Sequence, residues 1–151
     1  PGVVIATGNV ANALSFDPRV VNTYLSRDSG ASWDEILQGP HIYEFGNKGG
    51  LIVAAKMSSL GPANKIQFSK DEGETWTDLP LAREMNVHNI RVDPVGDGLV
   101  FLVHGTDSVE VSGDGDPDGV VYTIDFASLK DSNNAYVLHF TKSLRLLPIQ
   151  D

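Results

Sequence analysis

The sequence SRDSGASWDEIL at residues 26–37 has a second copy, SKDEGETWTDLP, at residues 69–80. Ser, Asp, Gly and Trp recur in the same order in both copies, as S-x-D-x-G-x-x-W, and the second copy begins 43 residues after the first. A motif that recurs at an interval of roughly 20–50 residues is typical of repeat architectures. The motif therefore predicts a chain built from repeated structural units.

Apolar segments recur at nearly the same interval. GVVIA begins at Gly2, GLIVA at Gly50 and GLVFLV at Gly98, each 48 residues after the one before. These segments are too short for helices and rich in Val, Ile and Leu, so they predict interior strands buried on both faces. The more polar segments NTYLS from Asn22 and NKIQFS from Asn64 lead into the two copies of the motif. Each motif is therefore predicted to be a turn between two strands.

One repeat contains four short strands. The segments HIYEFG from His41 and NVHNIRV from Asn86 precede the second and third apolar segments, across turn sequences rich in Gly, Asn and Asp. Four antiparallel strands per unit, at a period of roughly 40–50 residues, is the pattern of a β-propeller blade. A β-sandwich is the alternative, which the fixed period disfavours. We therefore predict an all-β fold made of propeller blades.

The predicted strands fill about 2.5 to 3 blades. Residues 1–40 form a blade without its first strand, residues 41–84 a complete blade, and residues 85–151 a third blade with an acidic insertion at 106–119 and a C-terminal segment of uncertain role. Most propellers close with about four to eight blades. We therefore expect the chain to be a segment of a larger propeller.

Each residue type of the repeated motif has a structural role. Ser and Asp at the end of a strand accept hydrogen bonds from backbone N–H groups of the turn, Gly adopts positive φ, and Trp covers the apolar interior. A carboxylate saturated by its own turn is poorly placed for catalysis or metal binding. The predicted structural residues are Ser26, Asp28, Gly30, Trp33, Ser69, Asp71, Gly73 and Trp76.

Composition and charge exclude several classes of function. With 11 Lys and Arg against 20 Asp and Glu, the formal net charge is -9, which repels nucleic acid and anionic membrane surfaces. No apolar run approaches the roughly 18 residues of a membrane span, and no signal segment is visible. Because Cys is absent, disulfides and thiolate chemistry are excluded.

The motif S-x-D-x-G-x-x-W resembles the Asp box, or BNR repeat, of sialidases and several other propeller families. Its surroundings are more specific. GVVIATGNVANAL, TYLSRDSGASWDEILQGPHIYEFGNKGGLIVAAKM and NKIQFSKDEGETW resemble the late blades of the VPS10 domain found in sortilin-type sorting receptors. The resemblance runs from about Gly2 to about Gly105. After Gly105 the chain departs from the family pattern, because the third repeat has no recognisable Asp box.

The resemblance implies a propeller of about ten blades, followed in the family by Cys-rich modules and usually one membrane span. Such receptors carry protein cargo between the Golgi and endosomes or the vacuole. It also implies a luminal, ligand-binding segment that needs no cofactor and makes no direct membrane contact. Its partners would be protein or peptide cargo and neighbouring blades, or further copies of the chain if it is free-standing. In the family the main cargo contacts lie on earlier blades, so the ligand-binding residues of this segment stay unassigned.

The acidic insertion contains a candidate calcium loop. DGDPDG at residues 114–119 has the form D-x-D-x-D-G, with Asp114, Asp116 and Asp118 as oxygen ligands. Later ligand positions fit poorly, because Tyr122 occupies the ninth position and Asp125 falls in a predicted strand. A solvated hairpin is the alternative.

The histidines show no spacing that would bind a metal. Each of them is a candidate for titration between neutral and endosomal pH. They are His41, His88, His104 and His139.

No catalytic motif accompanies the repeats. The chain has no G-x-S-x-G, no H-E-x-x-H and no Gly-rich phosphate loop, so we predict that it is not an enzyme. The alternative is an Asp-box glycosidase of the sialidase type, or a carbohydrate-binding propeller. A sialidase needs a cluster of arginines, and one of the available arginines lies inside the first motif. The arginines are Arg19, Arg27, Arg83, Arg91 and Arg145.

Overall fold

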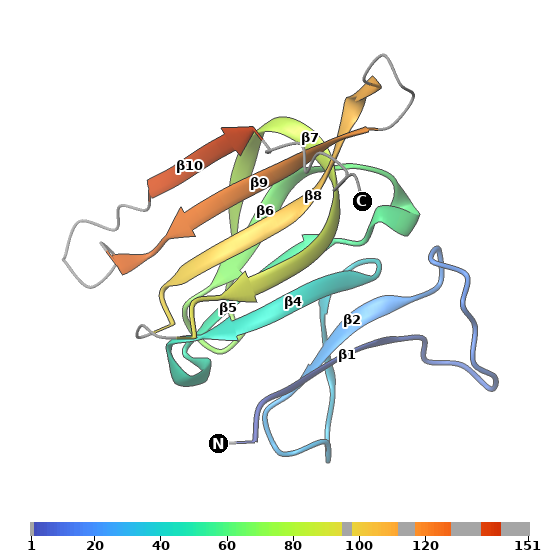
Figure 1. Cartoon of the computed structure of the whole chain (residues 1–151). Coiled ribbons are helices and arrows are strands. Elements are labelled where there is room, and N and C mark those ends of the chain that lie inside the picture. Colours follow the sequence, from blue (N-terminus) through green and yellow to red (C-terminus); the bar gives the residue numbers. More distant parts are fainter. Residues whose placement is uncertain (1, 95–97, 112–116, 128–136, 143–151) are drawn as a thin grey trace, which may run out of the picture.

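The computed structural model describes residues 2–94, 98–111, 117–127 and 137–142, and these residues form almost only antiparallel β-strands (Figure 1). The strands are β1 (Val4–Gly8), β2 (Asn22–Ser26), β3 (Asp34–Leu37), β4 (His41–Gly46), β5 (Leu51–Lys56), β6 (Ala63–Ser69), β7 (Thr77–Val92), β8 (Val100–Val111), β9 (Pro117–Asp125) and β10 (Val137–Lys142). Two 3-10 turns, η1 (Asn47–Gly49) and η2 (Ser58–Leu60), flank β5. The segments predicted as strands from the sequence are strands in the structure.

The strands form two sheets. The first contains three strands in the order β1-β2-β3, and the second contains seven in the order β10-β9-β8-β7-β6-β5-β4. Every pairing is antiparallel between strands that follow one another in the chain. This is the up-and-down order of propeller blades. The prediction of an all-β propeller fragment is confirmed.

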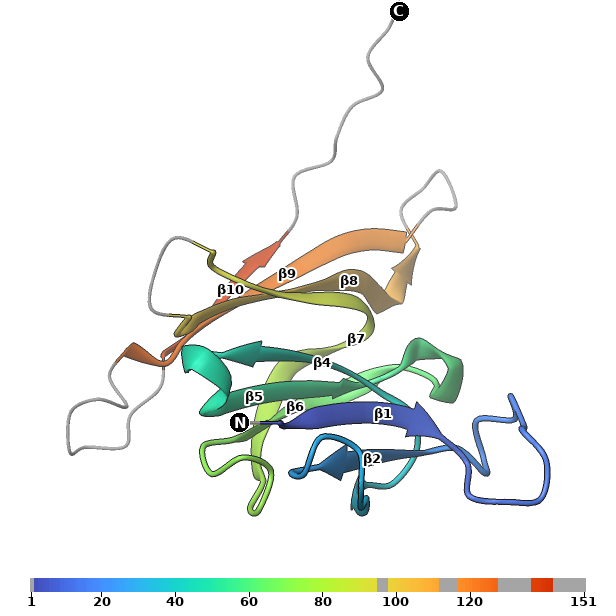
Figure 2. The same cartoon turned by 90° about the horizontal axis from the view of Figure 1, so that it is seen from below.

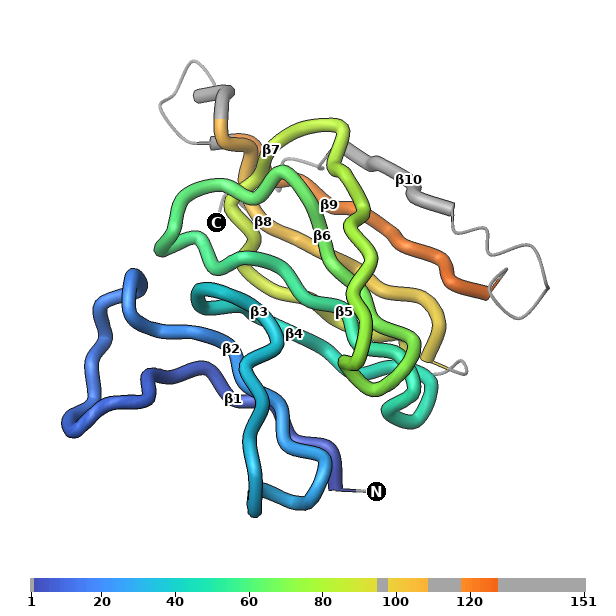
Figure 3. Tube along the Cα trace, turned by 180° about the vertical axis from the view of Figure 1, so that it is seen from behind, coloured from blue at the N-terminus to red at the C-terminus, as the bar shows by residue number. Residues whose placement is uncertain are grey.

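The long strand β7 differs from expectation. The sequence predicted that the strand after the second motif and the segment NVHNIRV from Asn86 are separate strands, but the structure has one continuous strand. Its first part pairs with β6, where Thr77 lies opposite Phe68, and its last part pairs with β8, where Val92 lies opposite Phe101. Register shifts in both pairings bend the strand. Figure 3 shows β7 passing from β6 over to β8. The division of the chain into three blades stays a prediction.

The bend in β7 curls the large sheet back on itself. In Figure 2 the chain forms three layers, with β1 and β2 below β4–β6, and β8–β10 above them. The main core fills the space between the upper two layers and joins Leu51, Val53 and Ile66 to Phe101 and Ile124. A smaller core of Ile5, Leu25 and Ile52 joins the lower two layers. The stacked layers, two from the curled seven-stranded sheet and one from the three-stranded sheet, therefore bury each other's apolar faces.

Only one of the three apolar segments is buried on both faces. All five apolar residues of β5, from Leu51 to Ala55, are buried. Val4 on β1 is 40% exposed and Leu102 on β8 is 45% exposed, so the prediction of two buried faces is wrong for these strands. The reason is geometric, because β5 lies in the middle layer and has a sheet on each side, whereas β1 and β8 lie in the outer layers.

Tyr122 on β9 gives a test of the main core. Its side chain is fully buried, and its hydroxyl oxygen accepts a hydrogen bond from Arg83 N at 3.0 Å and donates to Arg83 O at 3.3 Å. Replacing Tyr122 with Phe should lower the free energy of unfolding by about 1–3 kcal/mol, because two backbone groups of β7 lose this partner. Urea unfolding followed by Trp fluorescence measures the change.

The matched control is Tyr24→Phe. Tyr24 is half-buried on β2, and its hydroxyl has no hydrogen bond to a described residue. Its replacement should leave the urea midpoint nearly unchanged. Equal losses in the two variants would contradict the structural role of the Tyr122 hydroxyl.

Candidate functional site

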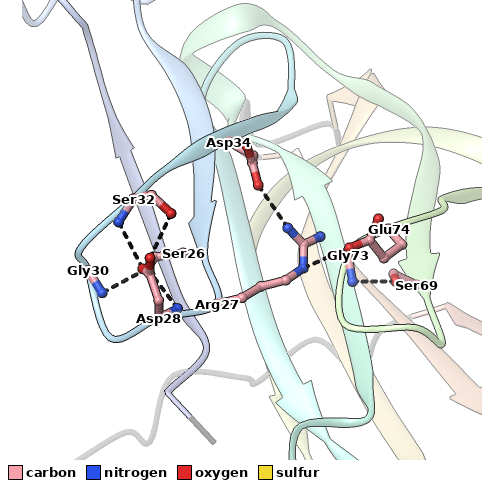
Figure 4. Close-up of polar contacts among 9 residues, drawn as sticks. All are labelled: Ser26, Arg27, Asp28, Gly30, Ser32, Asp34, Ser69, Gly73 and Glu74. Atoms are coloured by element: carbon pink, nitrogen blue, oxygen red, sulfur yellow. Dashed lines mark hydrogen bonds and ion pairs between the residues drawn. The ribbon is translucent and has the colours of Figure 1, made fainter.

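The first Asp-box turn connects β2 to β3 and is closed by its own side chains (Figure 4). Ser26 Oγ accepts a hydrogen bond from Gly30 N at 2.7 Å and donates to Asp28 Oδ1 at 2.8 Å. The carboxylate of Asp28 accepts two further hydrogen bonds, from Ser32 N at 2.8 Å and from Ser32 Oγ at 2.7 Å. Gly30 has φ of +96°, a conformation that glycine adopts readily.

The second turn connects β6 to β7 and repeats this geometry. Ser69 Oγ accepts from Gly73 N at 2.8 Å and donates to Asp71 Oδ1 at 2.7 Å. Asp71 accepts from Thr75 N at 2.9 Å and from Thr75 Oγ1 at 2.5 Å. Gly73 has φ of +84°. The same hydrogen bonds thus close both turns, although the residues between the shared positions differ.

The hydrogen bonds of the turns fix the charge of both carboxylates. Bonds from the amide and hydroxyl of Ser32, with a further bond from Ser26, lower the pKa of Asp28 to about 2. Bonds from the hydroxyl and amide of Thr75, with one from Ser69, lower the pKa of Asp71 to about 2. Carboxylates with so low a pKa are weak proton acceptors at neutral pH. The two turns are therefore suited to holding strands together rather than to acid–base chemistry.

Sequence reasoning missed one member of each turn. Ser32 and Thr75 each supply two hydrogen bonds to the carboxylate of their turn. A signal was present, because a hydroxyl residue directly precedes the tryptophan in both copies of the motif.

The two tryptophans differ in their surroundings. Trp76 packs against the smaller core, beside Leu25 and Ile52, as the sequence led us to expect of both. Trp33 is 42% exposed, and its Nε1 donates to Gly30 O within its own turn at 3.1 Å. Trp76 packs against side chains of β1 and β2, whereas Trp33 belongs to neither hydrophobic cluster of the described residues.

Arg27 links the two turns. Its Nη1 lies 3.0 Å from Asp34 Oδ2 on β3, and its Nε lies 3.1 Å from Glu74 Oε1 in the second turn (Figure 4). The approach to Glu74 is not aligned for a hydrogen bond, so the attraction there is Coulombic. Next to this contact the buried side chain of Leu25 lies against Gly73. A cation and an apolar side chain of one turn thus reach into the next.

The candidate metal ligands are only partly within the described residues. Asp114 and Asp116 of the predicted calcium loop lie outside them, and Asp118 lies in β9. Within the described ranges, no three His, Asp or Glu side chains are grouped to hold a metal. His41 is buried, His88 and His104 are exposed, and His139 lies in β10.

Strands β4 and β7, which contain the segments HIYEFG and NVHNIRV, lie next to each other. Strand β4, which contains residues 43–45, lies beside β7, and Asn47 N after β4 donates to Gly98 O before β8 at 2.9 Å. A cleft of about 640 Å³ extends between them, and its lining includes Glu44, Arg91, Val92, Asp93, Val100 and Leu102. Apolar side chains with charges of both signs suit contact with a peptide.

Three arginines are paired with carboxylates at separate places. Arg19 pairs with Asp17 at 2.6 Å, Arg27 with Asp34 and Glu74, and Arg83 Nη1 with Asp107 at 3.0 Å. Arg91 lines the cleft beside β4, and Arg145 lies outside the described residues. Within the part of the chain that the structure describes, these arginines do not form the cluster that a sialidase requires. The structure also contains, in this part, no helix long and apolar enough to cross a membrane.

The fold and the paired turns define a segment of an Asp-box β-propeller. The family model described as "Sortilin, neurotensin receptor 3" matches residues 1–90, so the chain belongs to the sortilin–Vps10 family.

Fungal relatives agree with this family. A vacuolar protein sorting/targeting protein 10 of Ajellomyces capsulatus is 33% identical over 138 residues, which are 91% of this chain and 9% of the relative. The protein of the same name from Aspergillus oryzae is 34% identical over 131 residues, 87% of this chain and 8% of that protein. The one from Neurospora crassa is 36% identical over 107 residues, 70% of this chain and 7% of that protein. The chain thus spans less than a tenth of the length of these relatives.

The lowered pKa values predict a pH dependence of stability. An ordinary aspartate has a pKa of about 3.9, whereas Asp28 and Asp71 have values of about 2 in the folded chain. The stabilisation from a lowered pKa is present above the ordinary value and is lost as pH falls through the folded value. The free energy of unfolding should therefore decrease between about pH 5 and about pH 2, and urea midpoints across this range measure it.

The Asp28→Asn, Asp71→Asn double variant should lose part of this dependence, because amides do not titrate. Glu84→Gln, an exposed change on β7 outside both turns, is the control. An unaltered pH profile in the double variant would contradict the assignment.

The contact between Leu25 and Gly73 predicts that alanine destabilises the chain more at Gly73 than at Gly61. A Cβ at Gly73 would lie 2.6 Å from Leu25 Cδ1, whereas a Cβ at Gly61, with φ of +88°, would meet nothing within 4 Å. Alanine at either position costs about 1–2 kcal/mol in backbone strain. Gly73→Ala should cost about 1–3 kcal/mol more, because Leu25 is buried and has no room to move. Urea unfolding compares the variants, and equal costs would show that the two sheets are not in contact there.

Proposed function

We propose that this chain is a segment of the luminal, ligand-binding propeller of a receptor that sorts protein cargo between the Golgi and endosomes or the vacuole. The observation that carries the proposal is membership of the sortilin–Vps10 family. The name of the fungal relatives, vacuolar protein sorting/targeting protein 10, supports this route. The proposed partners are protein or peptide cargo and the neighbouring blades of the same receptor.

The geometry supports a binding role rather than a catalytic one. The carboxylates of the Asp boxes are saturated by their turns, whereas the cleft of about 640 Å³ beside β4 combines apolar and charged side chains. In propellers, ligands meet the faces or the channel that the innermost strands line. We propose that this segment completes the ring and presents the cleft toward the channel.

The proposed binding function needs no cofactor and no nucleic acid. Calcium binding by Asp114, Asp116 and Asp118 is a separate proposal, and its test is calcium titration of the chain with and without Asp118→Asn.

Sorting is tested by the fate of a soluble vacuolar or lysosomal hydrolase. Source cells that lack the full-length protein should secrete the hydrolase, and the wild-type gene should restore its retention. Arg27→Glu should restore it poorly, because the new carboxylate faces Asp34 and Glu74 at the contact between the two turns. The measurement is the fraction of hydrolase activity in the medium.

Arg19→Glu is the matched control, since the Arg19 side chain is 82% exposed and, among the described residues, pairs only with Asp17 of its own loop. Both variants are compared at equal steady-state amounts of receptor. If cells without the protein retain the hydrolase fully, the sorting proposal is wrong.

A further inference from the structure

A second cleft lies where the three-stranded sheet meets the middle layer, and its charge is unusual for this chain. It has a volume of about 350 Å³, and its lining includes Leu37, Gln38, His41, Lys56, Lys65 and Gln67. We call it the basic cleft. Of the described residues, no Asp or Glu lines it, although the chain carries a formal net charge of -9.

The register of β4, β5 and β6 brings the basic side chains together. His41 on β4 lies opposite Lys56 on β5, and Ala54 lies opposite Gln67 on β6. Side chains two residues apart on a strand share a face, so Lys56 lies on the face of Ala54 and Lys65 on the face of Gln67. Two lysines and a histidine therefore occupy one end of one face across three neighbouring strands.

The two lysines differ in their partners. Lys65 Nζ donates to Asp78 Oδ2 on β7 at 2.7 Å, and Gln67 Nε2 donates to Asp78 Oδ1 at 3.0 Å. Lys56 makes no ion pair with a described residue. One ammonium group of the basic cleft is thus neutralised by its own sheet, and the other is available to an anion from outside.

His41 lies at the wall of this cleft on the side of the three-stranded sheet. Its Nδ1 lies 3.0 Å from Gly39 O and 3.3 Å from Thr23 Oγ1. A carbonyl oxygen only accepts, so the proton of the neutral ring is on Nδ1. Burial is the main cause that lowers the pKa of His41, and the charges of Lys65 and Lys56 add to it, against hydrogen bonds to Gly39 and Gln67. At neutral pH the ring is uncharged, and a carboxylate bound in the cleft would favour its protonation.

We propose that the basic cleft binds the carboxylate of an Asp or Glu side chain presented by a peptide segment of a partner protein, with Lys56 as the main cationic contact. An ammonium group attracts a carboxylate most strongly where the site is partly shielded from water. The cleft is larger than a carboxylate alone requires, and the amides of Gln38 and Gln67 with the apolar side chain of Leu37 suit peptide groups. The basic cleft shares no lining residue with the cleft between β4 and β7, and the inference does not depend on the sorting function.

The experiment measures protection of individual lysines in the full-length protein. Acylation by a limiting amine-reactive reagent is followed at each lysine by mass spectrometry, with rising concentrations of an end-blocked tetrapeptide that contains two Glu residues. The peptide should slow acylation of Lys56 saturably. The exposed Lys48 in η1 is the internal reference and should react at an unchanged rate. A peptide with Gln in place of Glu should not protect Lys56.

Variants and pH then test the assignment by fluorescence anisotropy of the labelled Glu peptide. Lys56→Gln should weaken binding roughly tenfold, because the main charge pair is lost, whereas Lys48→Gln should leave binding unchanged. Binding should tighten as the pH falls below about 6.5, the ordinary pKa of histidine, because protonation of His41 then adds a second cation to the cleft while Glu is still largely ionised. His41→Gln should remove this pH dependence.

The proposal is overturned if the Glu peptide gives no saturable protection of Lys56, or if the Gln peptide protects it equally. Protection by inorganic sulfate but not by the peptide would also overturn it, since the cleft would then accept only small anions. Thermal unfolding of each variant shows that the fold is kept.

Discussion

A β-strand with apolar side chains on both faces is stable in water only when both faces are covered, and β5 imposes this constraint on the chain. Its five consecutive apolar residues are all buried. One face packs on β8 and β9, and the other on the sheet of β1–β3. Because an antiparallel sheet cannot cover both of its own faces, sheets must stack. The repeat in the sequence and the layers in the structure are two results of this requirement.

The Asp boxes supply hydrogen-bond acceptors for backbone N–H groups at the corners where the layers meet. Each turn pairs backbone N–H groups of its own corner with Ser and Asp side chains, so the chain changes direction with these backbone donors satisfied. Gly73 allows Leu25 to approach, and Arg27 sets a cation between Asp34 and Glu74. The same corner thus closes one sheet and contacts the next. The basic cleft lies along the same boundary between sheets.

The sequence was sufficient to predict the strands, their antiparallel order and the propeller class, because short apolar runs and polar turns recur with a fixed interval. It was not sufficient for features that depend on which sheet lies next to which. The continuity of β7 depends on two register shifts that leave no clear sequence signal. The same motif leaves Trp76 partly buried and Trp33 exposed, because only Trp76 packs against the core of Ile5, Leu25 and Ile52. Lys56 and Lys65 are nine residues apart in the sequence, and it is the register of β5 and β6 that brings them to the same face of the sheet.

The central claim is that consecutive Asp-box sheets stack face to face around β5, with Arg27 at their boundary. The most direct measurement is an electron cryomicroscopy map of the full-length protein that resolves side chains in this segment. We predict density for the Arg27 guanidinium between Asp34 and Glu74, with the indole of Trp76 beneath the β1–β3 sheet. A map in which the β1–β3 sheet lies away from β4–β6, with Leu25 exposed to solvent, would contradict it.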